Sequence, residues 1–447
     1  MNYPVWELPG LGGGLLIAIV AIVHVYVAQF AVGGGIFLAV AEWRAHRKGD
    51  REQLAYLRYH SRIFLLLTIV LGALTGVGIW FTIGLVSPHG TALLIRNFVW
   101  FWAIEWTFFI VEIAAALLYY YGWDRMSPRT HVATGAIYAA AAWLSLAVIS
   151  GIVAFMLTPG RWPETGNVLH AFFNPGYVPS MLARTAASLA LAGLWGLLTA
   201  PVARDARVRE EMVRFASYWL MPGFFALPLT SIWFLAVAPA PARALVLGGA
   251  APVSLMFFFT LAASALIFFY ARYGAFARAQ HVTPVAAAVV LALGLVATGG
   301  TEWVREGIRK PYLVYGVLYS NGLYARDIPA MQGRSVLAEA RWSLVKSAAE
   351  ADPLTAGREV FRVQCMSCHT IDGYNGIRPL VAGWNEELLD TGLQHLDRLK
   401  GFMPPLVGTD EERKALVAYL LSLNPPGQTA SAQQPALARA GALTGGE

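Results

Sequence analysis

Two cysteines and a histidine near the C-terminus carry the clearest chemical signal in the chain. Cys365, Cys368 and His369 form a Cys-x-x-Cys-His motif within "VQCMSCHTIDG". This is the spacing of covalent c-type heme attachment, in which both thiols form thioethers and the adjacent imidazole binds the iron. A redox dithiol and half of a zinc site are the alternatives, but the chain contains no further cysteine to complete a zinc site. The motif therefore predicts one covalent heme c.

The residues around this motif predict a small helical domain. "TAGREVFRVQ" is typical of an amphipathic helix leading into the motif, and "TDEERKALVAYLLSL" of a closing helix with an acidic first turn. With "GFMPPL" between them, residues 354–424 resemble a class I cytochrome c domain. The resemblance implies that Met403, in the Met-Pro loop, is the second iron ligand, which raises the reduction potential relative to two imidazoles. His395 is the alternative ligand, or a surface residue of a helix.

The composition predicts a membrane protein. Hydrophobic residues make up 57% of the 447 residues and charged residues 13%, whereas about a quarter of an average soluble domain is charged. Repeated apolar runs reach the roughly 20 residues that cross a bilayer as a helix. We therefore expect an all-α fold, with a polytopic bundle of about eight transmembrane helices in the lipid bilayer and a small all-α cytochrome c domain. The expected spans are 12–42, 63–86, 93–121, 131–157, 179–201, 215–238, 250–271 and 282–301.

The distribution of basic residues predicts the orientation. Alternate loops, at 43–62, 122–129, 202–214 and 272–281, hold 14 Lys and Arg, whereas the opposite loops hold three. By the positive-inside rule the first set is cytoplasmic, so the N-terminus and everything after residue 302 are expected on the periplasmic side of a bacterial inner membrane. Heme c is attached on that side. The net charge of +6 follows these loops and gives no indication of nucleic-acid binding.

Few ionisable residues lie within the expected spans, and three of them stand out. His24 is in the middle of the first, and Glu105 and Glu112 lie seven residues apart in the third. The two glutamates share one helix face, about 10 Å apart along the axis. Ionisable groups at membrane depth are costly and suggest function. The glutamates are interpreted either as a proton path or as polar contacts between helices.

The order of several short motifs gives a family resemblance. The third span runs from Glu112 into "GWDR" at 122–125, His131 follows, and "EGIRKP" at 306–311 ends the eighth span. With His24, these features resemble subunit I of the cytochrome bd-type quinol oxidases, over residues 12–311. The resemblance implies that His24 binds a heme iron and that Glu112 and Glu105 serve an oxygen-reducing heme. Glu105 lies one residue away from the matching position in the family.

The chain departs from this family in its other heme ligands. The long quinol-binding loop after the sixth helix is replaced by about a dozen residues, "VAPAPARALVLGG". The position of the low-spin heme histidine falls on Ala183 or Arg184, although Met256 matches the partner methionine. The late-helix heme glutamate aligns with Gly299, which leaves Glu302, one turn away, as the nearest substitute.

The remaining candidates are Arg184 and three histidines. Arg184 either pairs with a heme propionate or is an interfacial arginine that extends to the headgroups. His170, in the "NVLHAFFNPGY" loop before the altered fifth helix, is a candidate heme ligand. His60 and His131 are expected at cytoplasmic helix ends, where a solvated histidine is the ordinary case.

Two functions remain open from the sequence. The first is a bd-type oxidase relative that receives electrons through its own heme c and passes them to membrane heme b, with oxygen reduction. The second is a non-oxidase heme anchor that links the quinone pool or a partner complex to a periplasmic redox protein. One or two hemes b are expected, while a heme d is not indicated. The expected partners are a second membrane subunit or a larger respiratory complex, and a periplasmic cytochrome c or other redox protein.

The chain is accordingly expected to have four regions: a transmembrane heme domain at 1–311, a periplasmic linker at 312–353, the cytochrome c domain at 354–424 and a tail at 425–447. The tail is rich in Pro, Ala, Gly and Gln, a composition typical of disorder.

Replacing Met403 by Ala tests the assignment in the Met-Pro loop. We expect the variant to lower the heme c reduction potential or to leave the iron high-spin, because the thioether ligand is lost. Visible spectra and a redox titration measure both effects. An unaltered spectrum would move the ligand role elsewhere, first to His395.

Overall fold

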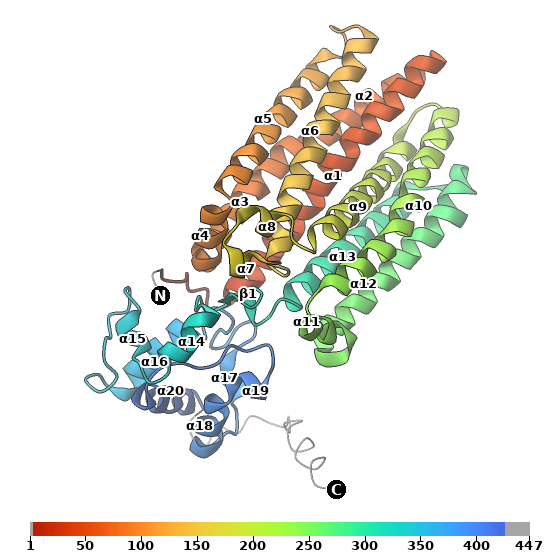
Figure 1. The fold of residues 1–447 in the computed structure, drawn as a ribbon. Coiled ribbons are helices and arrows are strands. Elements are labelled where there is room, and N and C mark those ends of the chain that lie inside the picture. The colour runs from red at the N-terminus through yellow and green to blue at the C-terminus, as the bar shows by residue number, and fades with distance from the viewer. Residues whose placement is uncertain (1–2, 425–447) are drawn as a thin grey trace.

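The computed structural model describes residues 3–424 as a long helical bundle with a smaller helical domain at one end (Figure 1). The region predicted to be a disordered tail, 425–447, lies outside the described residues. We call the end of the bundle that carries the C-terminal domain the domain end, and the other end the distal end. The N-terminal residues lie at the domain end, beside the C-terminal domain.

Eight helices of the described chain are long and apolar enough to cross a membrane, which confirms the predicted number. The expected span 93–121 begins later than predicted, because Phe98 leaves helical geometry (φ −113°, ψ 26°) and separates the short α4 (Pro88–Asn97) from α5. The eight spans are α1 (Gly12–Lys48); α2 (Arg51–Leu65), η1 (Leu66–Leu71) and α3 (Gly72–Val86) as one; α5 (Val99–Gly122); α6 (Pro128–Phe155); α9 (Tyr177–Thr199) with η2 (Ala200–Val202); α10 (Ala206–Val237); α12 (Ala251–Phe269) with η4 (Tyr270–Phe276); and α13 (Pro284–Gly307).

Short elements complete the two ends of the bundle. At the domain end these are α4, α7 (Trp162–Thr165), α8 (Val168–Phe172), α11 (Ala240–Ala244) and η3 (Leu245–Gly249), and η5 (Ala279–His281) joins α12 to α13 at the distal end.

Glycines allow the backbones of the central helices to approach to van der Waals contact. A Cβ on Gly33 of α1 would lie 1.9 Å from the carbonyl oxygen of Ser188 in α9, and one on Gly193 of α9 would lie 2.7 Å from that of Ala216 in α10. Small residues at such positions are what lets helices approach closely in lipid, where van der Waals packing holds them together. Phe30, Phe37 and Leu194 fill the core beside these contacts.

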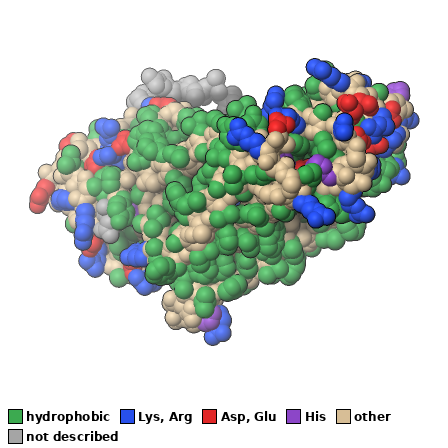
Figure 2. Space-filling view, turned by 90° about the horizontal axis from the view of Figure 1, so that it is seen from above, with side chains coloured by type: hydrophobic (Ala, Val, Ile, Leu, Met, Phe, Trp, Pro, Cys, Tyr) green, Lys and Arg blue, Asp and Glu red, His purple; other side chains and the backbone are tan. Residues whose placement is uncertain are grey.

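The outer surface of the bundle is apolar between two charged ends. In the space-filling view, hydrophobic side chains cover the middle of the molecule while Lys, Arg, Asp and Glu gather at both ends (Figure 2). Large side chains such as Trp100 and Phe225 are exposed on this surface. An apolar belt of this kind matches the hydrocarbon core of a bilayer.

Residues 312–353, expected to be a linker, fold onto both neighbours. The antiparallel pair β1 (Tyr312–Val314) and β2 (Leu318–Tyr319) buries Val314 and Leu318 against Phe98 at the domain end. Further along, Val336 packs into the core of the C-terminal domain. The predicted boundaries of the four regions stay a prediction. The elements of this segment after the hairpin are η6 (Ala325–Asp327), α14 (Ile328–Met331) and α15 (Val336–Glu339).

The C-terminal domain is built on the crossing of its first and last helices. A Cβ on Gly357 would lie 2.0 Å from the carbonyl oxygen of Ala415, so only glycine permits this contact. Thr409 and Glu412 form a capping box at the start of the last helix, as its acidic first turn suggested. The helices are α16 (Pro353–Gln364), α17 (Ile377–Leu380), α18 (Glu386–Gln394), α19 (Leu396–Leu399) and α20 (Asp410–Ser422).

Gly33→Ala should destabilise the bundle by about 1–3 kcal/mol, the usual cost of overpacking, because its new methyl group meets the α9 backbone. Loss of detergent-solubilised protein after stepwise heating measures the change. Gly84→Ala is the matched control, since a Cβ there has no neighbour within 4 Å. Equal heat resistance of the two variants would contradict the prediction.

Candidate heme-binding sites

The Cys-x-x-Cys-His motif forms a tight turn at the end of α16. The amides of Cys368 and His369 both donate to the carbonyl of Cys365, at 3.0 Å. Both cysteines are free thiols, and burial raises the pKa of the Cys365 thiol to about 12. The His369 Nδ1 lies 3.0 Å from the carbonyl oxygen of Asn375.

This hydrogen bond fixes the histidine for iron binding. Since a carbonyl only accepts, Nδ1 carries the proton and Nε2 keeps its lone pair. Burial lowers the pKa of His369, which favours the neutral imidazole. Asn375 adopts a left-handed conformation (φ 52°), and its side chain donates to the Cys368 carbonyl at 2.8 Å. The residues of the motif therefore fit a covalently attached heme c.

The loop containing Met403 is tied to the helix that precedes the motif. Gln364 donates to the Val407 carbonyl at 2.8 Å and accepts from the Val407 amide at 3.1 Å. Met403 is half-buried in this loop, whereas His395 is exposed at the start of α19. Met403 as the second ligand stays a prediction. Half-buried apolar side chains that pack against the core of this domain include Met366, Ile371, Ile377, Trp384, Leu396 and Leu406.

His24 faces α3 within the membrane bundle. Its Nδ1 lies 3.2 Å from the hydroxyl oxygen of Thr75, and that hydroxyl donates to the Leu71 carbonyl at 2.7 Å. The hydroxyl proton is thus in use, so His24 Nδ1 donates and Nε2 keeps its lone pair. Gly76 lies beside the ring, where a Cβ would be 3.3 Å from His24 Cε1. A half-buried imidazole with a free nitrogen and little side-chain bulk beside it fits a heme ligand.

Charged residues gather where α13 reaches the domain end. Glu302 is buried and lies 2.8 Å from the Arg305 guanidinium, and Glu306 pairs with Arg309 and, at 3.2 Å, with Lys310. We call these five residues the α13-end cluster. A further charged residue outside this cluster, Arg184 of α9, is close enough to interact electrostatically with Glu302 and Arg305.

One arginine of the α13-end cluster has an unused donor. Arg309 is 5% exposed, and its Nε has no hydrogen-bond partner among the described residues. A buried polar group without a partner calls for an explanation, such as an absent ligand. Since guanidinium groups bind carboxylates with paired hydrogen bonds, the cluster fits the propionates of a heme.

Glu105 and Glu112 both face α6, as their spacing predicted. Ser145 donates to Glu105 at 2.8 Å, and the Tyr138 hydroxyl lies 3.0 Å from Glu112. The Tyr138 hydroxyl is also 3.1 Å from the carbonyl oxygen of Ala31. One phenolic proton cannot serve both acceptors fully, so a protonated Glu112 is the species that satisfies the whole arrangement.

A second buried carboxylate, Glu42, was missed in the sequence. Its side chain is fully buried near the distal end, 2.7 Å from both His131 Nδ1 and the Tyr119 hydroxyl, and 3.2 Å from His46 Nε2. The expectation that His131 is solvated was wrong, because this pairing leaves it 3% exposed. The signal in the sequence was a glutamate four residues before a histidine at the end of the first span.

His60 was also expected to be solvated, and this was wrong. It is 1% exposed, and its Nδ1 lies 2.8 Å from the Thr199 hydroxyl. His170 lies on α8 at the domain end, with its Nδ1 2.9 Å from the Thr165 hydroxyl. His170 makes no contact with His24 among the described residues, and its role as a ligand stays a prediction.

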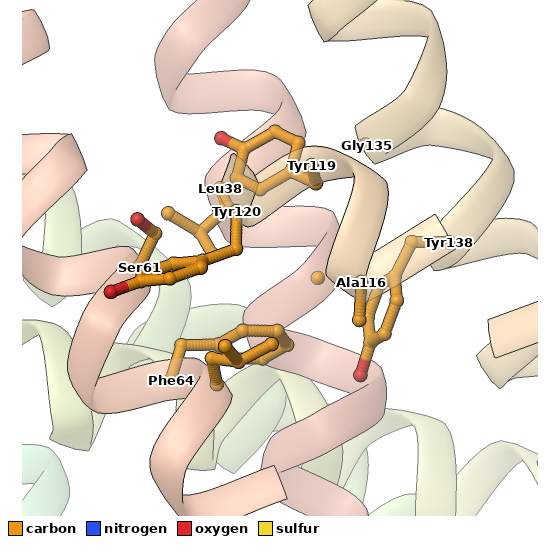
Figure 3. A pocket seen from close by; sticks show the side chains of 10 residues that line it. Leu38, Ser61, Phe64, Ala116, Tyr119, Tyr120, Gly135 and Tyr138 are labelled. Carbon is orange, nitrogen blue, oxygen red and sulfur yellow. The ribbon is translucent and has the colours of Figure 1, made fainter. Parts of the chain in front are cut away.

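A small pocket separates the Glu42 group from the Glu112 group. Tyr119 and Tyr138 both line it, together with Phe64 and Ser61 (Figure 3). The hydroxyl groups of the two tyrosines point away from each other, one to each polar group. The space between the Glu42 and Glu112 side chains is therefore bordered mainly by ring faces and apolar side chains.

Eight apolar helices and a Cys-x-x-Cys-His domain define a membrane-bound heme protein of the respiratory class. Residues 15–234 match the family described as cytochrome bd terminal oxidase subunit I. Residues 352–420 match the family described as cytochrome c oxidase, cbb3-type, subunit III. The chain thus joins a membrane domain of the cytochrome bd subunit I type to a cytochrome c domain.

A solved structure shares the fold. A chain of the bd oxidase from Geobacillus thermodenitrificans superposes with a TM-score of 0.59 at 16% sequence identity, over 69% of this chain and 90% of that chain. No curated protein sequence matches at a significant level.

His24→Ala should remove at least one non-covalent heme, because the imidazole with the free Nε2 is lost. The ratio of heme b to heme c in a pyridine hemochrome spectrum gives the count, with the covalent heme as internal standard. His281→Ala, at an exposed position on η5, is the control and should keep the wild-type ratio. An unchanged ratio in the His24 variant would exclude this ligand.

Proposed function

We propose that this protein is a bd-type oxidase relative that takes electrons through its own heme c and reduces oxygen at a heme held near His24. The observation that carries the proposal is the position of the heme c motif. The loop that follows Cys368 and His369 packs on the domain end of the bundle, where Tyr374 donates to the Gly10 carbonyl at 2.9 Å and its ring contacts Trp303.

The membrane residues supply the binding of a heme. His24 offers Nε2 to the iron, and Arg184, Arg305 and Arg309 are positioned to neutralise propionates at the domain end. When bound, a heme would supply one-electron chemistry and oxygen binding. Glu302 and Glu306 keep the arginines charged and oriented through their ion pairs.

Glu112 and Glu105 supply protons. Both are carboxyl groups at membrane depth with a hydroxyl partner on α6, and neither forms an ion pair among the described residues. Such a group holds a proton at a defined atom and passes it on through its hydroxyl neighbour, as general acid–base chemistry requires.

The cofactor content we propose is one heme c and one or two hemes b. His24 accounts for the first heme b, and His170 or Glu302 would account for a second ligand. No residue indicates heme d. The expected periplasmic side for the cytochrome c domain rests on the basic loops, which all lie at the distal end in the structure.

A specific observation favours the second function, a heme anchor without oxygen chemistry. The family's low-spin histidine position is Ala183 or Arg184, and its late-helix glutamate position is Gly299. Here Arg184 is engaged with the α13-end cluster. A six-coordinate heme at His24 would then pass electrons between a partner subunit and a periplasmic redox protein.

Spectra and oxygen uptake separate the two functions. The reduced-minus-oxidised spectrum of the purified protein is recorded with and without carbon monoxide, and oxygen uptake is measured with reduced cytochrome c. We expect a carbon monoxide-sensitive membrane heme and oxygen uptake. If no heme binds carbon monoxide, the result establishes the heme anchor without oxygen chemistry instead.

Glu112→Gln should lower oxygen uptake about 10²-fold, the usual size of a lost general acid–base group. Heme content should stay unchanged, because the Gln amide can still donate a hydrogen bond to the Tyr138 hydroxyl, as the protonated carboxyl group does. Glu52→Gln, at an exposed position in the first turn of α2, is the control. Equal rates in the two variants would remove Glu112 from the proton path.

A further inference from the structure

The segment before the first helix, residues 3–11, lies between the two halves of the molecule. On the membrane side, the Trp6 amide donates to the Leu85 carbonyl at the end of α3, at 2.9 Å. On the other side, Arg362 of α16 donates to Glu7 at 2.6 Å. The Gly10 carbonyl accepts from the Tyr374 amide at 2.9 Å. The segment is therefore bonded to both halves along its length.

The contact with the heme-attachment loop is at backbone distance. A Cβ on Gly373 would lie 2.1 Å from the carbonyl oxygen of Gly10 and 2.6 Å from that of Pro9. A Cβ on Gly12, in the first turn of α1, would lie 3.1 Å from Thr370 Cγ2. Since backbone atoms cannot swing aside as a flexible side chain does, only glycine at 373 permits this approach.

Aromatic contact continues from this loop into the bundle. The rings of Tyr374 and Trp303 meet edge to face, with centroids 6.4 Å apart and planes at 84°. Trp303 lies one turn beyond Gly299 on the same face of α13. At Gly299 this face meets α1, where a Cβ would be 3.5 Å from Ile22 Cγ2. Ile22 is two residues before His24.

The depth of His24 below this contact follows from the geometry of α1. His24 follows Gly12 by twelve residues, which is about 18 Å along α1. The heme c loop, the start of α1 and the end of α13 thus converge above the proposed membrane heme.

From these contacts we infer that residues 3–11, the first turn of α1 and the end of α13 form a fixed dock for the heme-attachment loop, in which Trp303 and Tyr374 are the packed route for electrons from heme c to the heme at His24. The route rests on the proposed function, and the dock does not. One electron leaves a ferrous heme c and reduces a ferric membrane heme, while Trp303 and Tyr374 undergo no net oxidation.

A fixed dock has a consequence for partners. The side of the cytochrome c domain that carries residues 370–374 contacts residues 3–11 and the end of α13, while Tyr374 stays 43% exposed. A soluble redox protein would meet heme c from another side of the domain, and the domain need not swing between donor and acceptor.

Gly373→Ala in the full-length holoprotein tests the dock, by hydrogen exchange of peptides covering 3–11 and 370–378. We expect exchange in both peptides to rise about tenfold or more, because the hydrogen bond to Gly10 opens. Gly401→Ala is the control in the same domain, since a Cβ there has no neighbour within 4 Å. Unchanged exchange in the Gly373 variant, with wild-type heme c spectrum, would overturn the dock.

Trp303→Leu tests the electron route. After photoinjection of an electron into heme c, we expect its transfer to the membrane heme to slow about tenfold, since the packed route loses its ring while hydrogen exchange at 3–11 stays as in wild type. Trp303→Phe should recover part of the rate. Trp162→Leu, at the domain end but packed on Phe155 away from the dock, should transfer at the wild-type rate.

The two measurements separate the two claims. A wild-type transfer rate in Trp303→Leu with the dock intact would overturn the route. If heme c of the wild-type protein passes no electron to a membrane heme, the proposed function and the route both fail. The hydrogen-exchange result for Gly373→Ala would still decide the dock.

Discussion

The cost of an ionisable group inside a bilayer constrains most of this structure. An uncompensated charge at membrane depth costs several kcal/mol or more, so each buried carboxyl group has a partner on another helix or turn. Glu42 of α1 holds His131 of α6 and Tyr119 of α5. Glu302 of α13 pairs with Arg305 on the same helix, and the charge of Arg184 on α9 is close enough to interact with it. The Glu42 contacts join three helices at the distal end, charged groups gather at the domain end, and His24 lies between the two ends.

The sequence predicted the features that depend on local order. Eight spans follow from the length of apolar runs, and the heme c site follows from five consecutive residues. Glu105 and Glu112 share a helix face because they are seven residues apart, and both indeed bond to α6. These features could be predicted because each depends only on neighbours along the chain.

Other features depend on which helices face each other. The sequence predicts how deep a residue lies in the membrane, but not which neighbouring helix its side chain meets. His131 lies near a helix end as expected, whereas His60 lies more than two turns into α2, which begins at Arg51. Both point into the bundle and are buried. Glu42 could not be assigned a role without knowing that α5 and α6 meet α1 there. The contact of Glu7 with Arg362 joins residues 355 positions apart. Residues 312–353 resemble a linker in composition, but Val314 and Leu318 pack into a hydrophobic core with residues of α4 and α8.

Helix α1 connects the residues proposed for electron transfer with a buried carboxyl group that could hold a proton. Its first turn contacts the heme-attachment loop, His24 lies in its middle, and Glu42 lies near its last turn. Under the proposed function, electrons reach His24 from the domain end, whereas the buried carboxyl group of Glu42 lies toward the distal end. The apolar pocket between Tyr119 and Tyr138 interrupts the path from the distal end toward His24, so protons would cross the pocket only with transient water. Electrons and protons that meet from opposite ends move charge across the bilayer, which stores about 2.3 kcal/mol per charge for each 100 mV. The position of the dock at one end of α1 is what would make the reaction electrogenic.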